Sequence, residues 1–94
     1  MFKVMYSIGY TTRFKKDFKL CKRRGLDISI LAVVIELLRL NGHLPTIYKP
    51  HKLSGKYAGC WECHLQSDWL LVWKQNDMEL IILFMNTGSH SDLF

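Results

Sequence analysis

The stretch "CWECHLQSDWLLVWKQNDMELIILFM", Cys60 to Met85, decides the fold. It holds three runs rich in apolar and aromatic residues, 60–65, 68–74 and 78–85, separated by short polar segments. Runs of this length with polar breaks between them are typical of consecutive antiparallel strands. The segment "QND", residues 75–77, predicts the hairpin turn between the last two runs.

The first of these strands contains a Cys-x-x-Cys-His motif at residues 60–64. This motif is the attachment signature of c-type haem, and a cysteine pair alone can indicate zinc or redox chemistry. In a strand, however, Cys60 and Cys63 point to opposite faces, and Cys60 shares its face with Glu62 and His64. The chain has three cysteines in total, so it has no second pair for zinc. We therefore predict no metal site and no cofactor.

Upstream of residue 60 the sequence predicts one strand and two helices. The strand covers 4–10, and the first helix begins at Thr11 or Thr12 and ends near Gly25, with lysines and arginines outside its apolar stripe. A second, largely apolar helix covers 27–42, with Asp27 as its N-cap. Residues 43–59 contain both prolines and several turn formers, which indicates a loop.

These elements occur in the order β-α-α-β-β-β. This order predicts an α+β fold with a mostly antiparallel sheet and two N-terminal helices packed on one face. A length of 94 residues is typical of a single domain, so we expect residues 1–94 to form one.

The charge balance favours an anionic partner. Thirteen Lys and Arg against eight Asp and Glu give a formal net charge of +5, which suits nucleic acid or an acidic protein. The N-terminus shows no signal-peptide pattern, and the chain has no apolar run of about 18 residues. We therefore expect a cytoplasmic protein with no membrane partner.

The residues best suited to chemistry lie in the second half of the chain: His51, His64, Asp68 and His90. A lone histidine is more often structural than catalytic, but antiparallel strands can bring such residues together. Imidazole titrates near neutral pH, so one group can accept a proton while another donates one. Beside a basic surface, such a cluster favours metal-independent cleavage of RNA, with the ribose 2′-OH as nucleophile.

Two segments, "YKPHKLSGKYAGCWECHLQSDWLLVW" (48–73) and "NTGSHSDLF" (86–94), together resemble the YafQ branch of the RelE/ParE superfamily of bacterial type II toxins. The resemblance rests on the order and spacing of four features. These are a Lys-x-His-x-Leu-x-Gly loop, a Glu-Cys-His strand, an Asp-Trp pair and a Thr-Gly-Ser-His tail that ends in Leu-Phe. It extends from Tyr6 to Phe94.

The resemblance implies a ribosome-dependent mRNA endonuclease of RelE-like fold, neutralised by a cognate acidic antitoxin. Its catalytic positions correspond to His51, His64, Asp68 and His90. We assign His90 as the general acid and His51 or Asp68 as the base, with His64 as a phosphate-binding neighbour. The toxin alone is expected to be a monomer, and its complex with the antitoxin a higher-order assembly.

Six further residues are candidates for substrate binding: Lys49, Lys52, Lys56, Trp69, Asn86 and Phe94. The lysines would hold the RNA backbone, and Trp69 or Phe94 would stack on a base. Asn86 stands where many relatives carry arginine, and Ser67 stands where they usually carry proline. Two alternatives are a ParE-like toxin that binds gyrase and a catalytically weakened toxin that acts mainly as an antitoxin-binding co-repressor.

Overall fold

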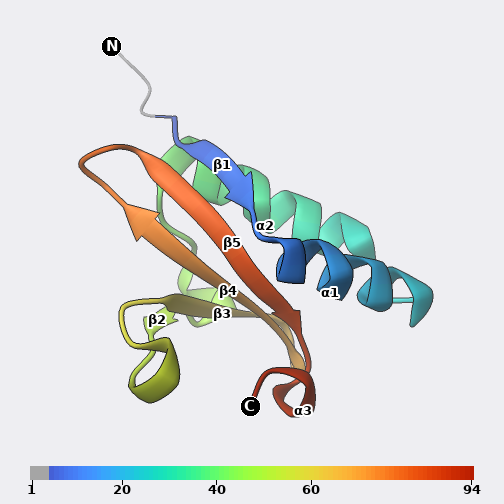
Figure 1. Cartoon of the computed structure of the whole chain (residues 1–94). Coiled ribbons are helices and arrows are strands. Elements are labelled where there is room, and N and C mark those ends of the chain that lie inside the picture. The colour runs from blue at the N-terminus through green and yellow to red at the C-terminus, as the bar shows by residue number, and fades with distance from the viewer. Residues whose placement is uncertain (1–4) are drawn as a thin grey trace.

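The computed structural model describes residues 5–94 and has a five-stranded sheet with the strand order β1-β5-β4-β3-β2 (Figure 1). The strands are β1 (Ser7–Tyr10), β2 (His51–Lys52), β3 (Trp61–Gln66), β4 (Trp69–Asn76) and β5 (Ile81–Gly88). The helices are α1 (Thr12–Arg23), α2 (Ile28–Asn41) and α3 (His90–Leu93), with 3₁₀ turns η1 (Thr46–Tyr48) and η2 (Gly55–Tyr57).

The predicted α+β class is confirmed, but the sheet is mixed rather than purely antiparallel. β2, β3, β4 and β5 form antiparallel pairs in sequence, whereas β1 pairs with β5 in parallel. The parallel pair arises because α1, α2 and three strands intervene between β1 and β5. The chain therefore reaches the edge of β5 by a long connection rather than a hairpin.

Both long helices begin where the sequence predicted. The Thr11 hydroxyl accepts a hydrogen bond from the Phe14 N–H at 3.0 Å, and the Asp27 carboxylate accepts one from the Ser29 N–H at 3.0 Å. Gly42 ends α2 in the left-handed conformation, with φ of 72°, and its N–H donates to the Leu38 carbonyl.

Three predicted boundaries were wrong. The first strand begins at Ser7, so Met5 and Tyr6 lie outside it, and the expected loop 43–59 contains β2 and both 3₁₀ turns. The C-terminal tail, for which no element was predicted, forms α3. The hairpin turn covers 77–80 rather than 75–77, because the Asn76 side chain accepts hydrogen bonds from the N–H groups of Met78 and Glu79 and closes the turn there. Val4, predicted to open the first strand, lies outside the described residues.

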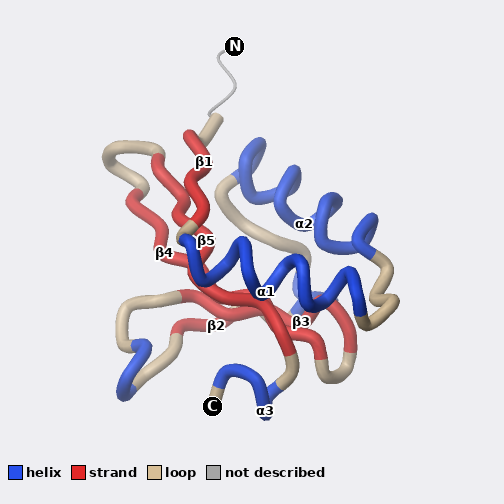
Figure 2. The backbone as a smooth tube through the Cα atoms, turned by 45° about the vertical axis from the view of Figure 1, so that its right-hand side comes forward, coloured by secondary structure: helices blue, strands red, loops and turns tan. Residues whose placement is uncertain are grey.

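The sheet has a different apolar cluster on each face. α1 and α2 lie on the same side of the sheet (Figure 2), and their buried residues pack with Cys63, Leu71 and Trp73. A smaller cluster on the other face contains Cys60, Leu70, Val72 and Leu93. Cys60 and Cys63 therefore face opposite ways, which confirms the prediction from strand parity.

Candidate active site

The sheet register places one row of side chains across four strands. His51 pairs with Glu62, Glu62 with Val72, and Val72 with Asn86. Directly paired residues point to the same face of a sheet. Since Val72 belongs to the smaller cluster, this row lies on the face away from α1 and α2. His64 lies on the same face, two residues beyond Glu62 along β3.

The structure brings the three predicted histidines together on this face. The ring centroids of His51 and His64 are 6.2 Å apart, and those of His64 and His90 are 6.3 Å apart. His90 is the first residue of α3, which a capping box between Ser89 and Asp92 holds at the end of β5. His64 therefore lies between the other two imidazoles.

Asp68, in the turn between β3 and β4, fixes the position of His90. Its Oδ1 accepts hydrogen bonds from the His90 backbone N–H at 3.0 Å and from the His90 Nδ1 at 3.3 Å. These bonds, first that from the backbone and then that from the ring, lower the pKa of Asp68 below its usual value. The carboxylate is therefore ionised at neutral pH and holds both the start of α3 and its first side chain.

His51 has a hydrogen-bond acceptor at each ring nitrogen. Its Nδ1 lies 2.9 Å from the Lys49 carbonyl oxygen, and its Nε2 lies 3.2 Å from Oε1 of Glu62. The Lys49 backbone is left-handed, with φ of 50°, and its carbonyl oxygen is the one that contacts His51.

Glu62 is the site residue to which the sequence analysis assigned no role. It is 4% exposed, and its Oε2 is buried without a hydrogen-bond partner among residues 5–94. A buried carboxylate needs a partner to offset its desolvation, and His51 is the partner that it has. Strand parity had placed Glu62 on the face of His64, and that was the signal that could have identified it.

His64 has no hydrogen bond to its ring in the part of the chain that the structure describes, and the ring is half-buried. Each of its two neighbours is held by a carboxylate, His51 by Glu62 and His90 by Asp68. His64 is thus the imidazole of the three that makes no hydrogen bond to a described residue. It can accept a proton without first losing a contact.

Phe94 and two of the three predicted lysines lie around this cluster. The Phe94 ring is 6.0 Å from that of His90 and meets the Tyr57 ring edge-on at 5.4 Å, and Phe94 is 61% exposed. Lys56 Nζ lies 5.5 Å from the centre of the Tyr57 ring. Lys49 lines a pocket together with His64. An exposed aromatic ring and two cations therefore border the imidazoles.

The structure does not place Trp69 or Lys52 at this cluster. Trp69 is 2% exposed within the core under the helices, and its Nε1 donates to the Thr87 hydroxyl at 2.9 Å, so its ring is closed to a base. Lys52 follows His51 in β2 and so points to the other face, where its Nζ lies 5.6 Å from the Trp61 ring centre.

Asn86 is buried and bound to α1. Its Nδ2 donates to Oδ2 of Asp17 at 3.3 Å, and Asp17 also accepts from the Thr87 N–H at 3.2 Å and from Arg13 Nε at 2.9 Å. These contacts join α1 to residues 86–87 of β5, which lie past the part of the strand that pairs with β1. By register Asn86 thus belongs to the row on the histidine face, and its amide is engaged with Asp17 of α1.

The cysteines form no metal centre. Among residues 5–94, no three His, Cys, Asp or Glu side chains are grouped so that they could hold a metal ion. All three cysteines are free and buried, and burial raises the pKa of Cys63 to about 12. The Cys-x-x-Cys spacing is therefore a consequence of strand packing.

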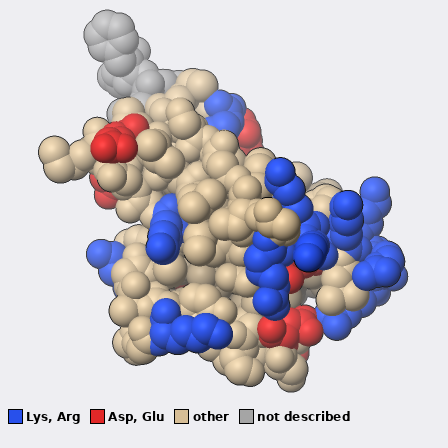
Figure 3. Space-filling view, in the orientation of Figure 1, with Lys and Arg blue, Asp and Glu red and all other residues tan. Residues whose placement is uncertain are grey.

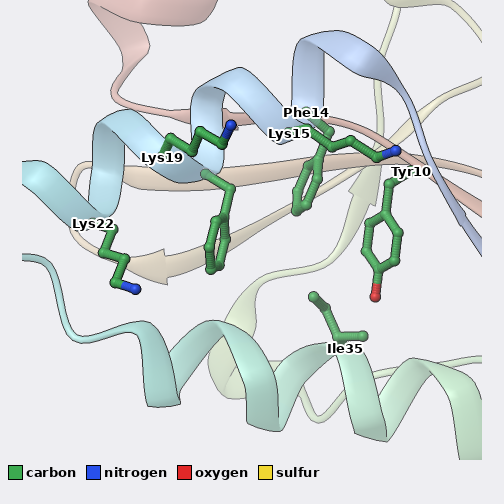
Figure 4. A pocket seen from close by; sticks show the side chains of 7 residues that line it. Tyr10, Phe14, Lys15, Lys19, Lys22 and Ile35 are labelled. Atoms are coloured by element: carbon green, nitrogen blue, oxygen red, sulfur yellow. The ribbon is translucent and has the colours of Figure 1, made fainter.

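A second surface feature lies between α1 and α2 (Figure 4). This groove, of about 520 Å³, has aromatic and aliphatic side chains at its floor and lysines at its rim. The lining residues are Tyr10, Phe14, Phe18, Ile35, Lys15, Lys19 and Lys22. In the space-filling view the Lys and Arg side chains gather over α1 (Figure 3). We call this feature the lysine groove.

The sequence and the fold both match known proteins. Residues 6–94 match the family described as bacterial toxin of type II toxin-antitoxin system, YafQ. The mRNA interferase toxin YafQ of Escherichia coli (strain K12) is 35% identical over 92 residues, which cover 97% of this chain and 98% of that protein.

Two solved structures agree with this match. The crystal structure of the E. coli DinJ-YafQ toxin-antitoxin complex has a TM-score of 0.87 at 35% identity and covers 97% of this chain and 99% of that one. A metal-bound toxin from Helicobacter pylori has a TM-score of 0.86 at 36% identity and covers 96% and 100%. The resemblance inferred from the motifs is thus confirmed over almost the whole length, and the chain belongs to the YafQ family of bacterial type II toxin-antitoxin toxins.

Proposed function

We propose that this protein is an mRNA interferase, an endoribonuclease that cleaves mRNA on the ribosome. The observation that carries the proposal is the line of three imidazoles, 6.2 and 6.3 Å apart, with a carboxylate on each outer ring. The E. coli relatives named mRNA interferase toxin YafQ support the same activity. Acting on translating ribosomes places the protein in the cytoplasm.

The reaction that fits these groups is attack by the ribose 2′-OH on the adjacent phosphorus. A base removes the 2′-OH proton while an acid gives a proton to the departing 5′-oxygen. The products are a 2′,3′-cyclic phosphate and a 5′-OH end, so no water is consumed. Both proton transfers can be made by imidazoles.

His90 is suited to be the general acid. Its Nδ1 donates to the ionised Asp68, which fixes the ring and leaves Nε2 to face the substrate. Asp68 is in turn poorly suited to be the base, because the same bonds lower its pKa. We assign Asp68 as the positioning residue of His90.

The contacts favour His64 as the base, in place of the His51 or Asp68 expected from the sequence. For His51 to accept a proton, its Nε2 would have to present a lone pair to the Glu62 carboxylate, which is electrostatically unfavourable. His51 is better suited to carry positive charge beside the phosphate. His64 has no such contact among the described residues and lies between the acid and that cation.

The groups around the cluster complete the substrate site. Lys49 and Lys56 supply positive charge for the RNA backbone, and Phe94 presents an exposed ring to a base. At position 86 this chain has an amide, bonded to Asp17, in place of a guanidinium. This observation favours the weakened toxin as the second candidate function.

The partner that we propose is a cognate acidic antitoxin. The relative in the DinJ-YafQ complex binds an antitoxin, and the net charge of +5 suits an acidic one. The lysine groove combines an apolar floor with a cationic rim, which matches an amphipathic acidic helix. No helix within residues 5–94 is long and apolar enough to cross a membrane. The toxin alone would be monomeric and would assemble further with the antitoxin.

A reconstituted translation system tests the activity. The 5′ ends of a defined mRNA are mapped with and without ribosomes, for wild type and for His90→Ala. Ribosome-dependent cuts that fall by about 10²- to 10⁴-fold in the variant establish the enzyme and the acid. A folded wild-type chain that binds its antitoxin but cuts nothing would contradict the proposal and select the weakened toxin. Recovery of cutting in Asn86→Arg would then identify the cause.

A modified substrate separates the base from the acid. Replacement of the bridging 5′-oxygen by sulfur at one cut site provides a leaving group that needs no proton. This substrate should restore cleavage by His90→Ala and leave His64→Gln inactive. If His51→Gln is instead the variant that stays inactive while His64→Gln recovers, the base is His51 and the assignment above is wrong.

A further inference from the structure

The pocket that Lys49 and His64 line lies beside the histidine cluster, at the edge of the sheet. It has a volume of about 430 Å³, which is within the range of roughly 300–1,000 Å³ typical of small-molecule sites. Its lining comes from η1, the end of β3 and the turn after it: Ile47, Tyr48, Lys49, His64, Leu65, Gln66 and Ser67. We call it the edge pocket. His64 belongs both to this pocket and to the line of imidazoles.

One wall of the edge pocket is an open strand edge. β2 is only two residues long and pairs with Trp61 and Glu62, so on the side of β3 away from β4 no strand within residues 5–94 covers β3 from Cys63 onward. An uncovered edge presents backbone N–H and C=O groups that have no ladder partner. In the ladder between β3 and β4, a shift of register between His64 and Gln66 distorts β3 next to the pocket, and bulges are common beside binding sites.

The opposite wall presents an apolar side chain and a cation. Ile47 is 79% exposed although it lies in a short, ordered turn, and its neighbour Tyr48 packs against the main core. Lys49 ends η1 in a left-handed conformation, and its carbonyl holds His51. The turn that carries Ile47 is therefore anchored on both sides, by Tyr48 in the core and by His51 in the site.

A nucleotide matches these three features together. Its base has flat apolar faces that pack on Ile47 and a polar rim that pairs with backbone groups and with Gln66 or Ser67, while its phosphate is attracted to Lys49. The shared His64 places this pocket one nucleotide from a phosphate bound at the imidazoles. We infer that the edge pocket binds the nucleobase adjoining the cleaved phosphate in single-stranded RNA and contributes a base preference at that position.

This inference rests on the proposed endonuclease, and two measurements test it. The first is an NMR titration of the full chain with trinucleotides in which 2′-O-methyl groups block attack, with each base in turn at the middle position. We expect amide shifts at Ile47, Gln66 and Ser67 whose size depends on that base. Shifts that avoid these residues, or that are equal for all four bases, would overturn the inference.

The second measurement is the map of mRNA cut sites for Ile47→Ala and Gln66→Ala. Met78→Ala is the matched control, because Met78 is 95% exposed in the hairpin turn and lines no part of the pocket. We expect the two pocket variants to lose about tenfold in cutting at the preferred base, and the control to match wild type.

The two proposals fail in different ways. If wild type cuts mRNA and both pocket variants keep its base preference, the edge pocket is not a base site although the enzyme stands. If wild type cuts nothing, the endonuclease fails and the base site falls with it. If the pocket variants lose affinity for the antitoxin but keep the cutting pattern, the open edge of β3 pairs with a protein strand, which also overturns the inference.

Discussion

At the scale of single residues, burial distinguishes Trp69 from Phe94, two aromatic side chains with the same predicted role. Both were candidates to stack on a base. Trp69 is 2% exposed with its N–H bonded to Thr87, whereas Phe94 is 61% exposed beside His90. Sequence position could not separate them, because an Asp-Trp pair at the start of a strand and a terminal Leu-Phe give no measure of exposure.

Substitution by alanine should have different effects at these two positions. Trp69→Ala removes a fully buried ring and should lower the free energy of unfolding by about 3–5 kcal/mol. Phe94→Ala removes an exposed ring and should leave that free energy nearly unchanged while it reduces mRNA cleavage. Urea unfolding together with the cleavage assay measures both effects. Cleavage by Phe94→Ala at the wild-type rate would exclude a role for this ring in the site.

The thiols should be inert in the folded protein. Burial raises the pKa of Cys63 to about 12, so this thiol stays protonated and unreactive at neutral pH, and Cys21 and Cys60 are also buried. An aromatic disulfide reagent such as DTNB should therefore titrate almost no thiol in the native chain and three after unfolding. Rapid reaction of one thiol in the native state would show that the Cys-x-x-Cys segment is accessible after all.

At the scale of elements, α3 is the smallest helix and the one on which the site depends most. Arg24, just after α1, donates from Nη1 to Oδ2 of Asp92 at 2.6 Å, and the Asp92 carboxylate also accepts from the Ser89 N–H. These contacts fix α3 between α1 and β5 and so place His90. A four-residue helix has no apolar period of its own, which is why the sequence pattern did not reveal it.

Asp92 should make stability depend on pH at the acid end. Hydrogen bonding from Arg24, followed by that from Ser89, lowers the pKa of Asp92 from 3.8 to about 2. A depressed pKa contributes stability that is present above about pH 4 and is lost as the pH falls toward 2. Asp92→Asn should flatten the stability curve across that window.

Unfolding by urea at several pH values checks this prediction. Glu79→Gln, at an exposed position in the hairpin turn, is the control because it makes the same change of charge. If the two variants lose the same amount of stability at each pH, the Arg24–Asp92 pair does not contribute in the way that the contacts indicate.

At the scale of the whole molecule, the two sides of the sheet have different tasks. The face away from α1 and α2 carries the histidines, the edge pocket lies at the open edge of β3, and the helix side carries the lysine groove. Figure 3 shows the concentration of cations over α1. The separation predicts that antitoxin binding and RNA cleavage can be altered independently.

Charge reversal in the lysine groove tests this separation. Lys15→Glu combined with Lys19→Glu should weaken binding of the cognate antitoxin strongly while the histidine cluster stays intact. Lys74→Glu on β4 reverses a charge outside the groove and serves as the control. Calorimetric titration with purified antitoxin measures the affinity, and the cleavage assay verifies the site. Equal affinities for the groove variant and the control would show that the antitoxin docks elsewhere.

Local sequence patterns were sufficient to predict the two long helices, the main strands and the side chains available for chemistry. Strand alternation separated Cys60 from Cys63, the caps at Thr11 and Asp27 set both helix starts, and the spacing of the motifs identified the family. These features are local, because they depend on backbone periodicity and on side chains within a few residues of one another. They could therefore be recognised without knowledge of the fold.

The tertiary structure alone decided which residues meet. His51, His64 and His90 converge only because β2 and β3 present their histidines on one face of the sheet and α3 begins beside that face, and Glu62 joins them through its register with His51. The parallel pairing of β1 with β5 likewise joins segments more than seventy residues apart. Such contacts depend on register and packing between distant segments, which local pattern does not encode, and they determine which imidazoles contact a carboxylate and which does not.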